Sequence, residues 1–375
     1  MSWVIAGGGT GGHVTPALAL GEALRERGER VLFLGSERGL ETKLVPAAGF
    51  ELAALPSQQV MGRSLLGRVR GVLGILRCSS AARRELKRVA ADVVISVGGY
   101  AAMPAILAAI LTRTPMALVE PNAIPGRVNR LSSRFARRVF AGFEVAAQRL
   151  AAGDRGRCVG IPLRRSLIDA FPTSEARREA TSPFRLLVFG GSQGARQINE
   201  AMMSAATRLA ALEIEIEVFH CSGKADLQRV QRAYDEAGLR AEVVSFEPNL
   251  PQRYLWADLA ICRSGALTVA ELALAGLPSL LVPYPYAADD HQAANAEELE
   301  RRGAARRLSG LDDPEQAGDR VAEAIGDLFG KPEQLASMSA AARGFARPDA
   351  ARDIVESCLE MLASNSGEPQ REVAS

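Results

Sequence analysis

The sequence lacks any long hydrophobic run. The longest apolar stretch, residues 101–111, has 11 residues and contains Pro104, whereas a helix that crosses a bilayer needs about 20. We therefore expect a protein that is not integral to a membrane. Because residues 1–13 enter a strand and a glycine-rich turn at once, we also expect no signal peptide.

Cysteine is scarce and shows no metal or redox spacing. The five residues form no CxxC pair, which indicates reduced, mostly buried thiols of a cytosolic protein. They are Cys78, Cys158, Cys221, Cys262 and Cys358. The three histidines are scattered, and the neighbouring carboxylates Asp289 and Asp290 lack convincing further ligands. We predict no metal site and no required cofactor.

Charge of one sign is not in excess either. The formal net charge is +2, so no strong global field draws the protein to nucleic acid or to a membrane, and any basic patch must be local. We expect no nucleic-acid partner. With 47% hydrophobic residues, 23% charged residues and 35 glycines, the composition is that of a globular protein rich in turns.

Short apolar runs alternate with turns and amphipathic segments, which predicts parallel sheets with helices on both faces. The expected strands are residues 3–6, 31–34, 93–97, 116–119 and 139–141, then 185–189, 214–220, 242–246, 259–262 and 279–282. A chain of 375 residues is expected to form two domains. The sequence therefore predicts an α/β protein with two Rossmann-like, doubly wound domains.

The two series of strands are separated by residues 160–184, which contain three prolines and a charged run and indicate a linker. We place the N-terminal domain at residues 1–163 and the C-terminal domain at 164–340. The last helical pattern, residues 338–362, has no following strand, and we expect 341–362 to pack back on the N-terminal domain. The polar tail, 363–375, should be disordered.

Three glycine-rich loops share one design, in which a strand leads through a glycine pair into a helix. They span residues 7–13, 98–100 and 190–194. Glycine lets a ligand approach the backbone, and a helix N-terminus offers N–H groups to an anion. One such loop is explained by a tight connection without ligand, but three in two domains indicate ligand sites.

The first loop also matches the dinucleotide fingerprint G-x-G-x-x-G at Gly7, Gly9 and Gly12. Glu37 lies near the end of the next expected strand, and Ser36 with Arg38 would suit a 2′-phosphate. An NAD(P)-dependent oxidoreductase is therefore one alternative, although it leaves the C-terminal half unexplained.

The most informative stretch is residues 258–278. A buried strand ends near Arg263, and a helix starts near 266–268, so that its amides and the Thr268 hydroxyl can hold phosphate without a metal. Glu271 follows within about the first turn, where it can accept hydrogen bonds from two ribose hydroxyls. Capping of the helix explains Glu271 equally well.

Four segments together resemble the signature blocks of the MurG family, the UDP-GlcNAc transferases of peptidoglycan synthesis. The blocks are GGTGGHVTPALA (8–19), VGGYAAMPA (97–105), GGSQGARQIN (190–199) and CRSGALTVAELALAGLP (262–278). The resemblance covers residues 7 to about 362, and four blocks in this order are highly specific. It implies a GT-B fold, with two doubly wound domains facing a cleft.

The resemblance also implies that the C-terminal domain binds UDP-GlcNAc as a substrate. Positions that match donor-binding residues of the family are Arg164, Ser192, Phe246, Glu247, Ala266, Leu267, Thr268, Glu271 and Gln292. Glu271 corresponds to a ribose-binding carboxylate, Phe246 to a cover for the uracil ring and Gln292 to a contact with GlcNAc. Positions that match residues facing the sugar and the acceptor are Thr10, Gly11, Gly12, His13 and Asn122.

The match is incomplete at three positions. Pro121 and His291 stand where the family usually carries glutamine, and Ile161 stands where asparagine is usual. These departures concern fine contacts and not the implied activity.

The implied reaction is an inverting displacement that moves GlcNAc to the C4 hydroxyl of undecaprenyl-pyrophosphoryl-MurNAc-pentapeptide. It needs a base for the acceptor hydroxyl and stabilisation of the departing diphosphate. His13 is the candidate base, because the pKa of an imidazole in water, about 6.5, suits proton transfer near neutral pH. Asn122 is the second candidate catalytic residue. A role of His13 in orienting its loop or binding the diphosphate is an open alternative.

The lipid-linked acceptor implies a peripheral enzyme on the cytoplasmic face of the cell membrane. Residues 60–88 are apolar and basic together, and such a segment can lie on anionic headgroups. A solvated, partly buried helix is the competing interpretation. Other cell-wall synthesis enzymes are further expected partners.

Two more alternatives differ in chemistry from this hypothesis. A GT-B glycosyltransferase with a diacylglycerol or a natural-product aglycone as acceptor would share the donor half. A non-catalytic protein that binds nucleotide sugars would retain the same loops, although the complete set of motifs argues against it.

Overall fold

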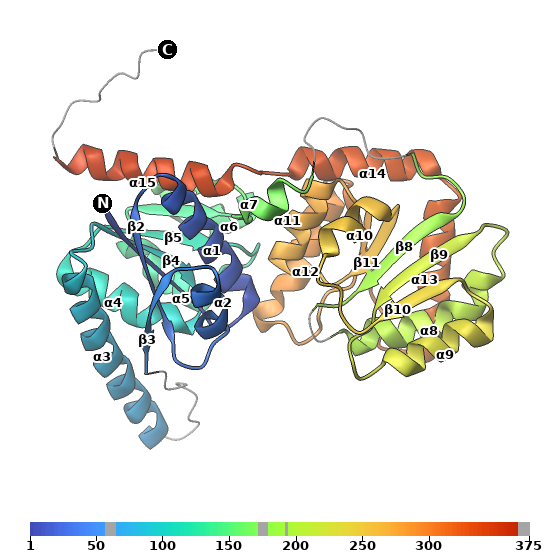
Figure 1. Ribbon diagram of the computed structural model, residues 1–375, viewed down its shortest axis with the longest axis horizontal. Helices are drawn as coiled ribbons and strands as arrows, with labels where there is room; N and C mark the ends of the chain where they lie inside the picture. The colour runs from blue at the N-terminus through green and yellow to red at the C-terminus, as the bar shows by residue number, and fades with distance from the viewer. Residues whose placement is uncertain (57–64, 172–178, 192–193, 367–375) are drawn as a thin grey trace, which may run out of the picture. The chain divides into compact units, whose positions relative to one another are not determined.

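The computed structural model describes residues 1–56, 65–171, 179–191 and 194–366 (Figure 1). The chain divides into two compact units. Unit 1 comprises Met1–Arg165 and Arg347–Ser375, and unit 2 comprises Ser166–Ala346. The division after Arg165 differs from the expected boundary at 163/164, and Arg164 belongs to unit 1.

Unit 1 is built on a parallel sheet with the strand order β3-β2-β1-β4-β5-β6-β7. Its strands are β1 (Ser2–Gly7), β2 (Arg30–Ser36), β3 (Glu51–Leu55), β4 (Val93–Gly98), β5 (Met116–Glu120), β6 (Arg138–Ala141) and β7 (Gly156–Cys158). Its helices are α1 (Gly11–Glu26), α2 (Glu41–Ala47), α3 (Leu65–Arg88), α4 (Met103–Thr112), α5 (Arg127–Ser132), α6 (Glu144–Arg149) and α15 (Ala350–Ser366). Single-turn 3₁₀ helices lie at η1 (Tyr100–Ala102), η2 (Ser133–Phe135) and η3 (Gly153–Arg155).

Successive residues of β1 enter two different cores, as the period-2 geometry of a strand requires. Trp3 and Ile5 belong to a core that also contains residues of α1 and α15, among them Leu18 and Ile354. Val4 and its alternate neighbours belong to a second core with residues of α3 and α4. Because both faces are covered, the strand is apolar throughout and carries no alternation.

Unit 2 repeats the design with the strand order β10-β9-β8-β11-β12-β13, again parallel. Its strands are β8 (Phe184–Phe189), β9 (Ile216–Cys221), β10 (Ala241–Val244), β11 (Leu259–Cys262), β12 (Ser279–Leu281) and β13 (Ala305–Arg307). Its helices are α8 (Arg196–Ala210), α9 (Leu227–Ala237), α10 (Leu250–Trp256), α11 (Ala266–Ala275), α12 (His291–Arg301), α13 (Pro314–Phe329) and α14 (Pro332–Phe345). The short helix α7 (Arg165–Ile168) lies at the division, and η4 (Ala288–Asp290) precedes α12.

The strand order of each unit reverses direction beside its first strand. In unit 1 the reversal lies between β1 and β4, and in unit 2 between β8 and β11. Open α/β sheets bind ligands outside the carboxyl ends of the strands at such a reversal. All three glycine-rich loops and the Arg263–Gly265 turn follow one of these four strands, so the topology places every predicted ligand loop at a binding position.

Three strands, β3, β7 and β13, were absent from the sequence prediction. Each lies at a sheet edge. The sequences of β7 and β13, GRC and ARR, have no run of apolar residues, and the run LAAL in β3 is short and mostly not buried. An edge strand pairs on one side and needs less apolar surface than a central strand, so its pattern is weak.

The single helix predicted for residues 338–362 is wrong. The structure has α14 and α15 with a break between Phe345 and Ala350. Pro348 lies in the break, and proline disfavours helical backbone at the preceding residue. Helix α15 packs on α1 and β6 and continues to Ser366, so residues 363–366 are helical and not part of a disordered tail. Residues 367–375 lie outside the described part of the chain.

The basic, apolar segment predicted to meet a membrane corresponds largely to α3. Its first residues, 60–64, lie outside the described residues, as do the side chains over most of the first half of the helix. Among the described helices, none has both the length and the apolar character needed to cross a bilayer.

Candidate active site

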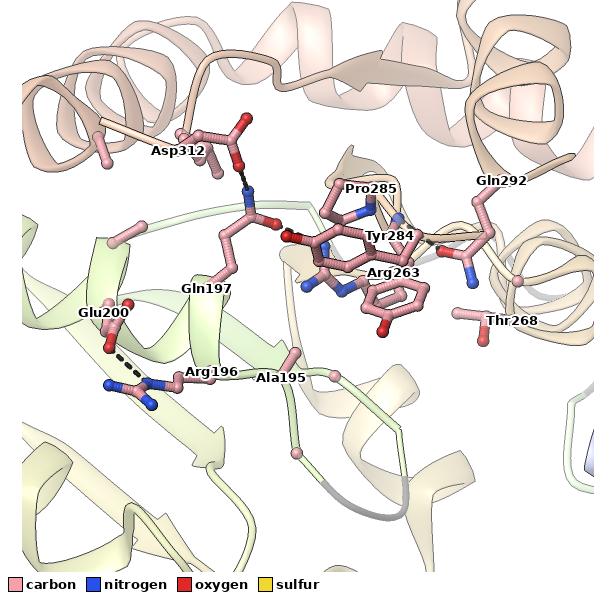
Figure 2. A pocket seen from close by; sticks show the side chains of 17 residues that line it. Ala195, Arg196, Gln197, Glu200, Arg263, Thr268, Tyr284, Pro285, Gln292 and Asp312 are labelled. Carbon is pink, nitrogen blue, oxygen red and sulfur yellow. Dashed lines mark hydrogen bonds and ion pairs between the residues drawn. The ribbon is translucent and has the colours of Figure 1, made fainter. Parts of the chain in front are cut away.

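A pocket of about 620 Å³ lies at the carboxyl ends of the strands of unit 2 (Figure 2). The loop after β8 contributes Gly190 and Gly194, and the turn after β11 contributes Arg263 and Gly265. The pocket therefore occupies the strand reversal, where the topology predicts a ligand.

The N-terminus of α11 forms one wall of this pocket. Gly265 precedes the helix in an extended conformation with no side-chain cap, and both Gly265 and Thr268 line the pocket. The first amides of a helix have no partner within the helix and favour an anion. Ala266, Leu267 and Thr268, the predicted phosphate-binding residues, are the first three residues of α11.

Arg263 places a cation in the same pocket. Its Nη1 donates to Gln197 Oε1 (2.8 Å) and to the carbonyl oxygens of Val282 (3.2 Å) and Pro283 (2.9 Å). Gln197 Nε2 in turn donates to Asp312 Oδ1 at 2.7 Å (Figure 2). The direct acceptors are neutral oxygens, and burial lowers the pKa of the Arg263 guanidinium. A desolvated cation held by neutral groups is suited to bind an anionic ligand.

Gln292 also lines the pocket and ties two segments together. Its Oε1 accepts the Tyr284 N–H at 3.0 Å, and its backbone carbonyl accepts the Ser264 hydroxyl at 2.8 Å. The Tyr284 ring lies under the Arg263 guanidinium, whose central carbon is 5.4 Å from the ring centroid. Gln292 therefore orients the loop that carries two exposed tyrosines, Tyr284 and Tyr286, on the wall of the pocket.

Glu271 is partly buried beside the pocket and is not among the residues that line it. Its Oε2 accepts the Tyr254 hydroxyl at 2.8 Å. Burial raises the pKa of Glu271 to about 7, while the hydrogen bond from Tyr254 opposes the shift. No side chain caps α11, so the structure contradicts the interpretation of Glu271 as a helix cap.

The remaining predicted donor residues of unit 2 lie elsewhere. Phe246 follows β10 and is 59% exposed, and neither it nor Glu247 lines the pocket. The Glu247 carboxylate accepts the Asn249 N–H at 2.8 Å and Arg253 Nε at 3.1 Å, which fixes the turn after Phe246. Ser192 lies outside the described residues.

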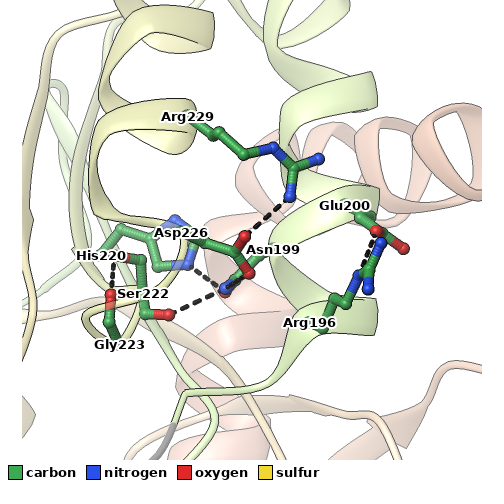
Figure 3. Close-up of polar contacts among 8 residues, drawn as sticks. All are labelled: Arg196, Asn199, Glu200, His220, Ser222, Gly223, Asp226 and Arg229. Carbon is green, nitrogen blue, oxygen red and sulfur yellow. Dashed lines mark hydrogen bonds and ion pairs between the residues drawn. The ribbon is translucent and has the colours of Figure 1, made fainter.

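A buried polar network supports the glycine loop behind the pocket (Figure 3). Asn199 Nδ2 donates to the Ser222 carbonyl (2.8 Å) and to Asp226 Oδ2 (2.9 Å), and its Oδ1 is 3.0 Å from His220 Nε2. Burial lowers the pKa of His220 to about 3, so the ring is neutral. Both ring nitrogens of His220 have hydrogen-bond partners, since Nδ1 lies 2.8 Å from the Tyr234 hydroxyl, so His220 is a structural residue. Across the described residues no three His, Cys, Asp or Glu side chains form a metal cluster.

Apart from Arg164, the predicted residues of unit 1 follow β1 and β5. Thr10 precedes α1, which begins at Gly11 and Gly12, and its Oγ1 lies 3.0 Å from His13 Nδ1. Asn122 donates from its backbone and side chain to Glu120 Oε1, at 2.9 and 3.3 Å.

Arg164 is separate from these loops. Its Nε and Nη2 donate to Glu22 Oε1 on α1 at 2.9 and 2.7 Å, and it does not line the pocket of unit 2.

The sequence prediction assigned no role to Arg263, Gln197, Tyr284 or Asp312, although all four line the pocket. Arg263 and Gln197 were visible inside two of the quoted blocks, and an arginine directly after a buried strand was a usable signal. Asp312 follows β13, whose pattern was not recognised, so nothing in the sequence related it to the other three.

Comparison with known proteins gives a consistent class. Residues 3–141 match the glycosyltransferase family 28 N-terminal domain, and residues 185–354 match the glycosyltransferase family 28 C-terminal domain. The two matched regions correspond to the two sheets, so the site belongs to a family 28 glycosyltransferase with an α/β, GT-B-like fold.

Individual relatives narrow this class. UDP-N-acetylglucosamine–N-acetylmuramyl-(pentapeptide) pyrophosphoryl-undecaprenol N-acetylglucosamine transferase from Geobacter metallireducens is 38% identical over 98% of this chain and 100% of the relative. The same enzyme from Halorhodospira halophila is 42% identical over 95% of this chain and 97% of the relative. The crystal structure of Acinetobacter baumannii MurG is similar with a TM-score of 0.80 and 30% identity, covering 96% and 99% of the two chains.

The chain therefore belongs to the MurG family of N-acetylglucosamine transferases. This membership confirms the predicted fold class and disfavours the NAD(P)-dependent oxidoreductase. It does not test the roles of the individual site residues.

Proposed function

We propose that the protein transfers GlcNAc from UDP-GlcNAc to the C4 hydroxyl of undecaprenyl-pyrophosphoryl-MurNAc-pentapeptide. Full-length relatives carry the name of this transferase. The observation in the structure that supports the proposal best is the pocket of unit 2, where a helix N-terminus and the Arg263 guanidinium meet. A nucleotide sugar presents a diphosphate to such a site.

In this proposal the diphosphate binds at the first amides of α11, with Thr268 and Arg263 beside it. As the glycosidic bond breaks, negative charge grows on the departing UDP. Groups already oriented toward that charge stabilise it more in the transition state than in the bound substrate. The hydrogen bonds of Arg263 to Gln197 and to two carbonyl oxygens hold the guanidinium in place before the reaction.

Glu271 accepts hydrogen bonds from the ribose hydroxyls, and Phe246 covers the uracil ring. Tyr254 holds one oxygen of the Glu271 carboxylate, which leaves the other oxygen for the ribose. Gln292, which also lines the pocket, contacts the GlcNAc hydroxyls. Ser192, outside the described residues, is a further donor contact in this proposal.

His13 accepts the proton of the acceptor hydroxyl. The C4 oxygen forms a bond to the anomeric carbon on the face opposite UDP, the bond to UDP breaks, and the configuration inverts. Thr10 lies 3.0 Å from His13 Nδ1 and orients the ring. Asn122, fixed by Glu120, binds the acceptor or the transferred sugar from the loop after β5.

The acceptor is a lipid, so the protein works at the cytoplasmic face of an anionic membrane, beside other cell-wall synthesis enzymes. The described end of α3 carries exposed Arg77, Arg83, Arg84 and Lys87, which suit anionic headgroups. Vesicle sedimentation with and without anionic lipid tests this part independently of turnover.

A direct assay tests the proposed reaction. Purified protein is incubated with UDP-GlcNAc and a short-chain lipid-linked muramyl-pentapeptide, and the lipid product is weighed by mass spectrometry. We expect a gain of one N-acetylhexosamine, and no gain when a diacylglycerol replaces the muramyl acceptor. Binding of UDP-GlcNAc without transfer would reject this acceptor, and absence of both would reject the donor site.

Two variants separate the donor and acceptor roles in this assay. We expect His13→Ala to keep UDP-GlcNAc affinity and lose turnover, and Glu271→Ala to lose affinity. Near-wild-type turnover of His13→Ala would show that His13 is not the base.

A further inference from the structure

A buried carboxylate occupies the first glycine loop of unit 1. Glu41, the first residue of α2, is 1% exposed. Its Oε2 accepts the Gly9 N–H at 2.8 Å, and its Oε1 accepts the Ser36 N–H at 2.8 Å and the Ser36 hydroxyl at 2.7 Å. One side chain thus joins the loop after β1 to the end of β2.

Three glycines make room for this carboxylate. A Cβ added at Gly8 would lie 2.3 Å from Glu41 Oε1, one at Gly35 2.6 Å from its Cγ, and one at Gly39 2.0 Å from its Oε2. Side chains at these positions cannot coexist with Glu41. Hydrogen bonds from Gly9 and Ser36 outweigh the desolvation of the carboxylate and lower the pKa of Glu41, so the group is charged.

The carboxylate takes the place that a bound anion or a ribose would occupy in a dinucleotide-binding loop. There the amide of the glycine loop faces a phosphate, and polar groups at the end of the second strand face the ribose or its 2′-phosphate. Here Gly9 and Ser36 donate to Glu41 instead. The chain itself therefore supplies the acceptor for these donors.

The same loop determines where His13 lies. Gly9 has a φ of +89°, and Thr10, the next residue, accepts the N–H groups of His13 and Val14 with its carbonyl, both at 3.1 Å. The second glycine loop packs against the first, because a Cβ at Gly99 would lie 2.9 Å from the Gly8 carbonyl oxygen and 3.4 Å from His13 Nδ1. A shift of residues 8–10 would therefore move the His13 ring.

We propose that Glu41 is a positioning residue for His13, acting through Gly9 and Thr10. Its carboxylate substitutes for a ligand anion and keeps the loop in the conformation that presents His13 to the acceptor hydroxyl. The catalytic part of this inference rests on the proposed function, and the positional part does not.

Glu41→Gln tests the catalytic part, because the amide has the same shape but cannot accept at both ends. We expect kcat to fall about 10- to 100-fold, the loss that a small misplacement of a reacting group produces. The KM for UDP-GlcNAc should stay within about twofold, since Glu41 lies in unit 1 and the donor pocket in unit 2. Asp92→Asn is the matched control, because Asp92 Oδ2 accepts the Ser2 N–H at the opposite end of β1, at 2.7 Å.

Added formate provides a rescue that loss of folding would not show. In Glu41→Ala, formate should recover part of the lost kcat, and chloride at equal ionic strength should not. Wild-type kcat in Glu41→Gln would overturn the inference. So would an equal loss in Asp92→Asn, or a rise in the donor KM that matches the fall in kcat.

The positional part has a readout that needs no turnover. The chain has three histidines, so the ring resonances of the labelled protein are few, and His13→Gln assigns one of them. We expect Glu41→Gln to shift the His13 resonance and to leave His291 unchanged. An unchanged His13 resonance overturns the inference whether or not the wild-type protein transfers GlcNAc, whereas absent transfer with a shifted resonance counts only against the proposed function.

Discussion

The two units open with the same local design, a buried strand, a glycine-rich loop and a helix, yet the two loops differ in what they hold. In unit 1 a carboxylate of the chain itself, Glu41, accepts from Gly9 and fills the space beside the loop. In unit 2 the loop containing Gly190 and Gly194 opens on a pocket that carries Arg263. The loop of unit 1 thus meets an anionic side chain, whereas the loop of unit 2 borders a pocket with a buried cation, which favours an anionic ligand.

The two loops also differ in how they are supported. Gly9 has open space where a Cβ would be, and its conformation depends on the carboxylate that its amide meets. Gly194 packs tightly, since a Cβ there would lie 2.3 Å from the Ser222 carbonyl oxygen. Asn199 Nδ2 donates a hydrogen bond to the same oxygen. At Gly9 the loop of unit 1 is therefore held by a charged acceptor, and at Gly194 the loop of unit 2 is held by close packing.

Removing the Arg263 guanidinium from the pocket of unit 2 should have the largest effect on transfer. We expect Arg263→Ala to lower kcat/KM for UDP-GlcNAc about 100-fold, the upper range for a hydrogen bond to a charged group. Arg263→Lys should recover only part of this loss, because an ammonium cannot reproduce the forked contacts. Initial rates at varied UDP-GlcNAc give both values.

Arg196→Ala is the matched control for Arg263. This arginine lines the same pocket but pairs directly with Glu200, at 2.7 Å, and its side chain is 78% exposed. A small effect is expected, since exposed ion pairs contribute about 1 kcal/mol or less. Equal losses in the two variants would contradict the special role of Arg263.

Glycine substitutions test the contrast between charge and packing. Gly194→Ala should lower the free energy of unfolding by about 2–3 kcal/mol, because it adds a backbone clash to the cost of a positive φ. At Gly9 and Gly191 φ is also positive, but an added Cβ would meet no described atom within 4 Å. Gly9→Ala and Gly191→Ala should therefore each lower the free energy of unfolding by about 1–2 kcal/mol. Urea denaturation measures all three, and equal losses would contradict the packing argument.

The smallest expected effect is a pH dependence of donor affinity. Because the pKa of Glu271 is raised to about 7, the carboxylate is mostly protonated at pH 6 and ionised at pH 8. The ionised form is the better acceptor for ribose hydroxyls, so affinity for UDP-GlcNAc should fall about tenfold from pH 8 to pH 6. Calorimetry suits this test, since the diphosphate diester itself does not titrate in that range.

Glu271→Gln provides the control for this prediction. Its affinity should be lower than that of the wild type at pH 8 and independent of pH between 6 and 8. A flat wild-type profile would show that Glu271 does not bind the donor in its ionised form.

The central strands were predictable because a strand covered on both faces must be apolar at every position. For residues 3–6 and 259–262 an apolar run alone predicts a strand. The first run lies within β1, and the second coincides with β11. The edge strands β7 and β13 could not be found in this way, since GRC and ARR contain no apolar run and one open edge removes the need for one. The apolar run of β3 is short, LAAL. Pro348 is a signal in the sequence for the break between α14 and α15.

Among the site residues, Thr268 and Glu271 were found because they follow a buried strand at fixed spacing on one helix. Arg263 directly follows the same strand and could be found by the same observation. The role of Glu41 could not be predicted from the sequence. It lies far along the chain from Gly9, and the contact between them depends on how α2 returns to the end of β1.

The sequence by itself determined the fold class, the positions of the glycine-rich loops and the family, because apolar periodicity and the four motif blocks are local properties of the chain. Only the tertiary structure decided which loop is closed by Glu41, which one opens beside Arg263, and which elements of unit 1 the last helix contacts. Each of these features depends on contacts between segments that are distant in sequence. The free energy of such contacts depends on burial and charge in the folded molecule, which local sequence patterns do not give.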